Sequence, residues 1–93
     1  MSMYFNWEAI RSQQLLEERG ISFEDVVFYI QKGGLRDFLR FRNRQRESQQ
    51  AVLVVEIHNY VYLVPCIETG ESWFLQTITP SQKAKSSYLE VSE

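Results

Sequence analysis

The chain has 93 residues and a formal net charge of −2, the size of one domain with a single modest hydrophobic core. Hydrophobic residues make up 44% and charged residues 24%, a composition that excludes an intrinsically disordered chain. No apolar run reaches the roughly 18 residues of a membrane span, and no secretory signal opens the chain. The lone Cys66 excludes an internal disulfide, so we expect one cytoplasmic domain over 1–93.

Two helices are predicted in the first third of the chain. The first covers 6–19, because Asn6 suits an N-cap and Gly20 suits the end of a helix. The second begins at Ser22, which forms a capping box with Asp25. Its apolar residues recur at the spacing of a buried helix face, and a pair of glycines ends it.

Four segments rich in β-branched and aromatic residues are predicted to be strands: 35–42, 51–57, 60–67 and 72–79. A two-residue turn at 58–59 and a four-residue turn at 68–71 favour an antiparallel meander. That register places on one face Leu53, Val55, Ile57, Tyr60, Tyr62, Val64, Trp73 and Leu75. The other face carries Val52, Val54, Val61, Leu63, Phe74 and Ile78, with Glu56 and Gln76 among them.

Both faces of the predicted sheet are apolar, so both need a cover. We expect the first two helices on one face and either a last helix or another chain on the other. That last helix begins near Thr79, with Pro80 at its first position and Gln82 completing a capping box. Pro65 requires a bulge or a missing ladder bond in its strand. The predicted fold class is α+β: two N-terminal helices, an antiparallel sheet of three to four strands and a C-terminal helix.

An arginine row is the most informative feature of the sequence. Five of the seven arginines lie between 36 and 46, although the chain is acidic overall. If the strand at 35–42 continues, alternate arginines line one face, and the planar guanidinium group suits phosphate. The alternative is a solvated strand edge, where charge prevents edge-to-edge pairing. The row consists of Arg40, Arg42, Arg44 and Arg46.

Other residues that can carry chemistry are few. No phosphate-binding loop, paired histidines or cysteine-based metal motif is present, and we expect no cofactor. Glu56 shares strand parity with the lone His58, so the two can act as base and acid, although a hairpin turn more often places a histidine at the surface. Lys83 and Lys85 lie at the start of the last helix, where cations oppose the helix dipole but attract phosphate.

Short motifs stand at both ends of the chain. The opening has a Phe-x-Trp motif, a basic residue, a helix-ending glycine and a hydrophobic-Ser-Phe-Glu-acid start to the second helix. At the other end, the final predicted strand runs into a Ser-x-Lys-Ala helix start. The residues of these motifs are Phe5, Trp7, Arg11, Gly20, Ile21, Ser22, Phe23, Glu24, Asp25, Ser81, Lys83 and Ala84. In this order they resemble the BrnT-type toxins of bacterial toxin–antitoxin pairs.

The resemblance implies a RelE-like fold and a metal-independent ribonuclease that inhibits translation. It also implies a cognate antitoxin, usually with a ribbon-helix-helix DNA-binding part, that neutralises the toxin. The sequence departs from the family pattern at Glu18-Arg19, where Lys-His is usual, and at Gln82, where arginine is usual. Two positions expected to contact RNA are therefore changed.

Metal-free RNA cleavage needs a base for the 2′-hydroxyl proton and cations for the charged phosphorane. The arginine row, Lys83 and Lys85 can supply cations to RNA, whereas Glu56, Glu47 and Tyr88 remain alternatives for moving protons. Two other functions stay open. One is a non-enzymatic module, an inactive toxin relative that binds a partner protein through its second sheet face, and the other is a structural domain without an RNA role. The two apolar faces also predict a homodimer or a complex with the antitoxin.

Overall fold

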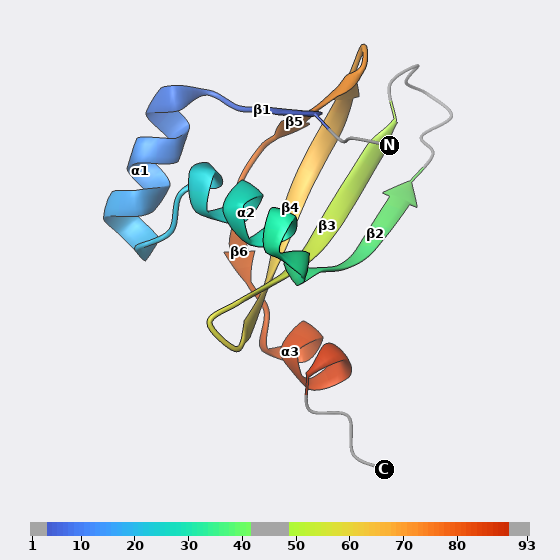
Figure 1. Ribbon diagram of the computed structural model, residues 1–93. Helices are drawn as coiled ribbons and strands as arrows, with labels where there is room; N and C mark the ends of the chain where they lie inside the picture. Colours follow the sequence, from blue (N-terminus) through green and yellow to red (C-terminus); the bar gives the residue numbers. More distant parts are fainter. Residues whose placement is uncertain (1–3, 42–48, 90–93) are drawn as a thin grey trace.

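The computed structural model describes residues 4–41 and 49–89 and shows the predicted α+β fold (Figure 1). None of the helices in these two ranges is long and apolar enough to cross a membrane. The elements in chain order are β1 (Tyr4–Asn6), α1 (Ala9–Arg19), α2 (Phe23–Tyr29), its continuation η1 (Ile30–Gly34), β2 (Leu35–Phe41), β3 (Gln50–Ile57), β4 (Tyr60–Thr69), β5 (Ser72–Leu75), β6 (Thr79–Pro80) and α3 (Gln82–Tyr88).

The described strands form one sheet in the order β1-β5-β4-β3-β2. The short strand β6 pairs with β4, as β5 does. The antiparallel meander from β2 to β5 is confirmed. The sequence prediction lacked β1, which adds a parallel edge next to β5, and it did not separate β6 from β5. In Figure 1, α2 crosses in front of the sheet, α1 lies beside it and α3 lies below it.

The predicted helix start at Asn6 is wrong. Asn6 belongs to β1, and α1 begins at Ala9 after Glu8, which has no side-chain cap bond. The extended chain puts Phe5 and Trp7, two residues apart, on one side, and both pack against the core. The Phe-x-Trp motif is therefore a strand signal. The helix end is confirmed, because Gly20 adopts a left-handed conformation with φ of 73°.

The β3–β4 and β4–β5 hairpin turns contain two residues each. His58 and Asn59 have positive φ values of 52° and 62°, which makes a type I′ turn. The second turn is shorter than the four residues predicted, because Thr69 pairs directly with Ser72. Gly70, with φ of 64°, provides its left-handed position. Since both the predicted and observed lengths are even, the paired residues of β3, β4 and β5 keep their predicted faces.

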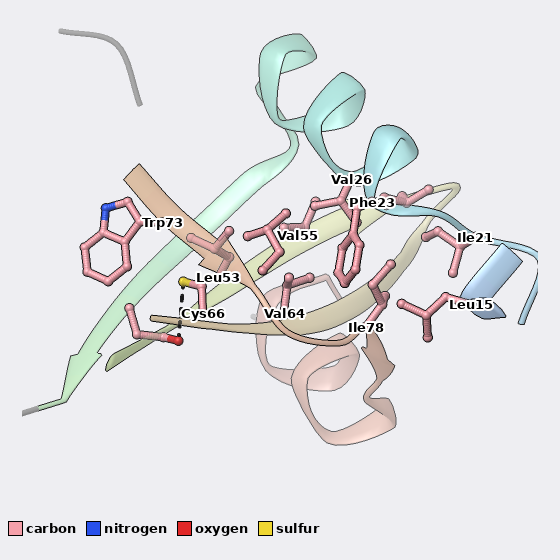
Figure 2. Close-up of a cluster of buried hydrophobic side chains, with 13 residues drawn as sticks. Leu15, Ile21, Phe23, Val26, Leu53, Val55, Val64, Cys66, Trp73 and Ile78 are labelled. Carbon is pink, nitrogen blue, oxygen red and sulfur yellow. Dashed lines mark hydrogen bonds between the residues drawn. The ribbon is translucent and has the colours of Figure 1, made fainter. Parts of the chain in front are cut away.

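The first sheet face carries the hydrophobic core, as predicted (Figure 2). Side chains of β3, β4 and β5 pack there against α1 and α2. Their burial removes large apolar side chains from water, at about 1.5–3 kcal/mol for each Val, Leu, Ile or Phe. The fully or almost fully buried members include Leu15, Phe23, Val26, Leu53, Val55, Val64, Cys66 and Leu75.

A proline interrupts the edge of β4 that faces β5. Pro65 pairs with Val52 in register, at a position where the polar groups of β4 point away from β3. The missing N–H therefore faces β5, which stops at Leu75, and Gln76 N donates to Pro65 O over 2.9 Å. Ile78, predicted on the second face, instead turns into the main core and is fully buried. That placement is corrected.

The last helix covers part of the second sheet face. Val54 and Val61 on this face are buried, and α3 packs against β4. The cap of α3 is Ser81, whose hydroxyl accepts from Ala84 N over 3.1 Å. The predicted cap, Thr79, lies in β6 instead, because its backbone is held by pairing with β4.

A buried serine joins the two N-terminal helices. Ser12 Oγ donates to Glu24 Oε1 over 2.6 Å and accepts from Phe23 N over 3.0 Å, so α1 fixes the first turn of α2. The predicted capping box is confirmed: Ser22 Oγ accepts from Asp25 N, and Asp25 Oδ2 accepts from Ser22 N. The Ser12 hydroxyl also lowers the pKa of Glu24 below its ordinary value of 4.5.

We expect Ser12→Ala to lower the free energy of unfolding by about 1–3 kcal/mol at neutral pH, because the buried Phe23 N–H loses its partner. Glu24 contributes stability above its unfolded pKa and loses it as the pH falls through its lowered folded pKa. The difference between wild type and variant should therefore shrink below pH 4.5. Urea unfolding across pH measures this, and Ser86→Ala on exposed α3 is the control. A pH-independent difference would contradict the role of Glu24.

Candidate functional site

A cleft at the end of β3 gathers the described residues best suited to chemistry. It measures about 320 Å³ and lies where η1 meets the sheet, next to the β3–β4 turn. It holds two cationic side chains, a carboxylate, an imidazole and a phenol. The lining residues are Tyr29, Lys32, Gly33, Gly34, Arg36, Glu56 and His58.

Two glycines let the helical segment approach the sheet closely. Gly33 has φ of 92°, a left-handed conformation that turns the chain from η1 into β2. At Gly34, an added Cβ would lie 2.7 Å from Glu56 O and 2.8 Å from Tyr29 O. The absence of a side chain at this position therefore permits the contact that forms the wall of the cleft.

A hydrogen bond between Tyr29 and His58 joins α2 to the β3–β4 turn. Tyr29 Oη lies 3.0 Å from His58 Nε2, and the two rings meet edge to face with centroids 5.3 Å apart. The turn presents the imidazole at the surface, and the phenol holds one of its nitrogens. The other nitrogen, Nδ1, has no hydrogen bond to any described residue and can exchange a proton.

Cations lie beside this pair. Arg36 Nε donates to Glu56 Oε1 over 2.8 Å, and Arg36 Nη2 contacts the same oxygen. Arg36 falls at a register irregularity between Leu35 and Asp37, which turns it toward the cleft rather than into the pairing pattern. Lys32 Nζ lies 5.4 Å from the centroid of the Phe28 ring. The cleft therefore carries two cations and one carboxylate, a local positive excess on an acidic chain.

Of the predicted catalytic residues, Glu56 lies in the cleft, whereas Lys83 and Tyr88 lie on α3 and are not among its lining residues. Tyr88 donates to Asp37 Oδ2 over 2.7 Å, and Lys83 is exposed. The predicted RNA-binding Lys85 places Nζ 5.2 Å from the centroid of the Tyr60 ring.

The arginine row and the cleft are at opposite ends of β3. Arg40 is opposite Ala51 at the start of this strand, whereas Glu56 is near its end. The guanidinium carbon of Arg40 lies 5.3 Å from the Phe38 ring centroid and 5.5 Å from that of Trp73, an arrangement typical of cation–π stacking. The other members of the row, Arg42, Arg44 and Arg46, and the alternative base Glu47, lie outside the described residues.

Two shifted pKa values point to structural roles. The hydrogen bond to Asp37 raises the pKa of Tyr88, because a carboxylate acceptor favours the neutral phenol. Tyr88 therefore acts as a donor that ties α3 to β2. Burial raises the pKa of the Cys66 thiol to about 12, which suppresses the reactive thiolate. Within the described ranges, no three His, Cys, Asp or Glu side chains gather to hold a metal ion.

Sequence reasoning named two of the seven residues that line the cleft, Glu56 and His58. Strand parity is not what brings them there, because His58 lies exposed in the β3–β4 turn, the surface position given as the alternative. Tyr29, Lys32 and Arg36 were missed as site residues. Their participation depends on the turn of the chain at η1 and on the register irregularity in β2, which a periodicity analysis does not detect.

Comparisons with protein-family models, curated proteins and solved structures find no match for the chain.

We expect Gly34→Ala to open the cleft, because its methyl group would collide with the backbone of Glu56 and Tyr29. Overpacking of this kind costs about 1–3 kcal/mol in unfolding free energy. NMR signals of the His58 ring should shift in this variant. Gly70→Ala is the control, since it has a positive φ but open space around it and should lose stability without moving those signals. Unshifted His58 signals in Gly34→Ala would contradict the close approach.

Proposed function

We propose that the protein is a ribonuclease toxin of a bacterial toxin–antitoxin pair, which cleaves RNA without a metal ion in the cleft around His58. The observation that carries this proposal is the hydrogen bond between Tyr29 and His58 in the cleft that also holds the paired Arg36 and Glu56. An imidazole and cations around one hollow are the groups that phosphodiester cleavage needs. The resemblance of both chain ends to BrnT-type toxins supplies the biological context.

The reaction is an internal transfer at phosphorus. The ribose 2′-oxygen forms a bond to the adjacent phosphorus, and the bond from phosphorus to the 5′-oxygen of the next nucleotide breaks. A base removes the 2′-hydroxyl proton, and an acid gives a proton to the departing 5′-oxygen. The products are a 2′,3′-cyclic phosphate and a free 5′-hydroxyl, so no water or redox partner is consumed.

The residues of the cleft divide these tasks. His58 Nδ1 takes the 2′-hydroxyl proton and then gives it to the departing 5′-oxygen, while Tyr29 orients the ring through Nε2. Arg36 and Lys32 stabilise the negative charge of the phosphorane. Glu56 holds the Arg36 guanidinium in place, because Arg36 Nε donates to its carboxylate over 2.8 Å. Glu56 thereby positions a cation, a role that differs from the proton transfer first considered for it.

We expect His58→Asn to lower the rate of RNA cleavage at least about 100-fold, the usual contribution of a general acid or base. Asparagine tolerates the left-handed conformation that His58 adopts, so the unfolding free energy should stay within about 0.5 kcal/mol. The assay measures cleavage of a single-stranded RNA by the purified protein and identifies the 2′,3′-cyclic phosphate end of the product. In a bacterial host, growth arrest and loss of intact RNA should also disappear.

Lys83→Ala is the matched control, because Lys83 is exposed on α3 away from the cleft. Cleavage lost in Lys83→Ala but retained in His58→Asn would move the site to α3. A folded wild-type protein that cleaves no RNA and arrests no growth would refute the proposed activity.

The second sheet face supports partner binding as a second function. Its register aligns Leu39 with Val52 and Pro65, and Ile67 with Phe74. Large apolar side chains on this face remain exposed. Single exposed apolar residues are normal on a protein surface, whereas several on one face indicate a binding surface. The exposed members are Tyr4 at 59%, Leu39 at 39%, Phe41 at 52% and Phe74 at 36%. We propose that this face binds the antitoxin.

We expect Leu39→Ser combined with Phe41→Ser to weaken binding of the protein encoded by the adjacent gene at least about tenfold, since anchors of an interface carry most of its affinity. RNA cleavage should be unchanged, because these residues lie at the far end of β2 from the cleft. Titration calorimetry measures the affinity, and Ile10→Ser on α1, where Ile10 is 68% exposed, is the control. Unchanged affinity in the double variant would exclude this face.

A further inference from the structure

A second hollow adjoins the cleft and shares its wall. It measures about 220 Å³, and Tyr29 and His58 line both hollows. Arg19, Asp25 and Tyr62 line only the second one. The hydrogen-bonded pair of Tyr29 and His58 therefore lines both the basic cleft, which contains Lys32 and Arg36, and the second hollow, which has other lining residues.

Aliphatic and aromatic side chains are part of the lining of the second hollow. Ile21 and Ile57 line it and are almost fully buried, at 5% and 3% exposed. Tyr29 and Tyr62 line it as half-buried aromatic rings. Its volume is below the roughly 300–1,000 Å³ of sites for drug-sized ligands, which favours a single flat ring system. Nucleobases stack on aromatic rings of this kind.

Two opposite charges in the hollow have free hydrogen-bonding capacity. Asp25 uses Oδ2 for its bonds to Ser22 N and Oγ, and among the described residues Oδ1 accepts no hydrogen bond. Arg19 Nη1 donates to Ile78 O, which uses one of the five N–H donors of the guanidinium. Both side chains are thus held by the fold and still present an acceptor and several donors.

We infer that this hollow takes the guanine base of the nucleotide whose 2′-hydroxyl attacks, an inference that rests on the proposed function. Guanine offers donors at N1 and N2 to the Asp25 carboxylate and acceptors at O6 and N7 to Arg19. Adenine carries an acceptor at N1, which opposes a carboxylate. With the base in this hollow and its 3′-phosphate near Lys32 and Arg36, the ribose lies beside His58, where the 2′-hydroxyl must lose its proton.

The test measures binding of guanosine 3′-monophosphate and adenosine 3′-monophosphate to the full chain by calorimetry. The guanine nucleotide should bind at least about tenfold more tightly. In Asp25→Asn, the free side-chain atom becomes a donor, so the preference should fall to about threefold or less. Glu17→Gln, at an exposed position of α1 outside the hollow, should keep the wild-type preference for the guanine nucleotide.

Thermal unfolding of each variant shows whether the fold is retained. If Asp25→Asn unfolds because its capping box is weakened, Tyr62→Leu keeps that box and must lower guanine nucleotide affinity at least about fivefold through lost stacking. Equal affinity of the wild type for both nucleotides, or a folded Asp25→Asn with unchanged preference, overturns the inference. RNA cleavage without any base preference refutes the guanine site alone, whereas guanine binding without cleavage refutes the ribonuclease alone.

Discussion

The two-residue turn at His58 and Asn59 fixes the register on which the rest of the structure depends. Its positive φ values match the right-handed twist of the strands, so β3 and β4 pair residue for residue from Ile57 opposite Tyr60 onward. A slip of one residue would exchange the two faces of the sheet. The same register orients the missing donor of Pro65 toward β5, which ends at Leu75, and Ile78 beyond that end lies in the core.

The turn that sets the register also presents the imidazole. His58 is exposed because it occupies the tip of a tight hairpin, and the Tyr29 phenol restrains it from the helical side. The close contact at Gly34 brings η1 against β3 and places Lys32 and Arg36 near that tip. Stability and the proposed chemistry thus share one end of the sheet, where a histidine in a left-handed conformation is held by its surroundings.

The cleft around His58 and the exposed apolar side chains of β2 lie at opposite ends of the strands. The cleft lies at the turn end of β3, whereas Arg40 and the exposed Leu39 and Phe41 lie at the opposite end of β2. Arg40 stacks over Phe38 and Trp73 on the core face, and the apolar side chains point to the second face. The two proposed functions therefore occupy different surfaces, and single substitutions can separate them.

The sequence alone determined the fold class, the antiparallel meander and the face of nearly every strand residue, because these depend on local periodicity and on turns of even length. Only the tertiary structure decided the rest: β1 arises from parallel pairing across 68 residues, from Tyr4 to Ser72. Likewise, Tyr29, Lys32 and Arg36 line one cleft with His58, where the absence of a side chain at Gly34 permits the close approach of helix and sheet. Contacts distant along the chain leave no periodic pattern, and the site is made of such contacts.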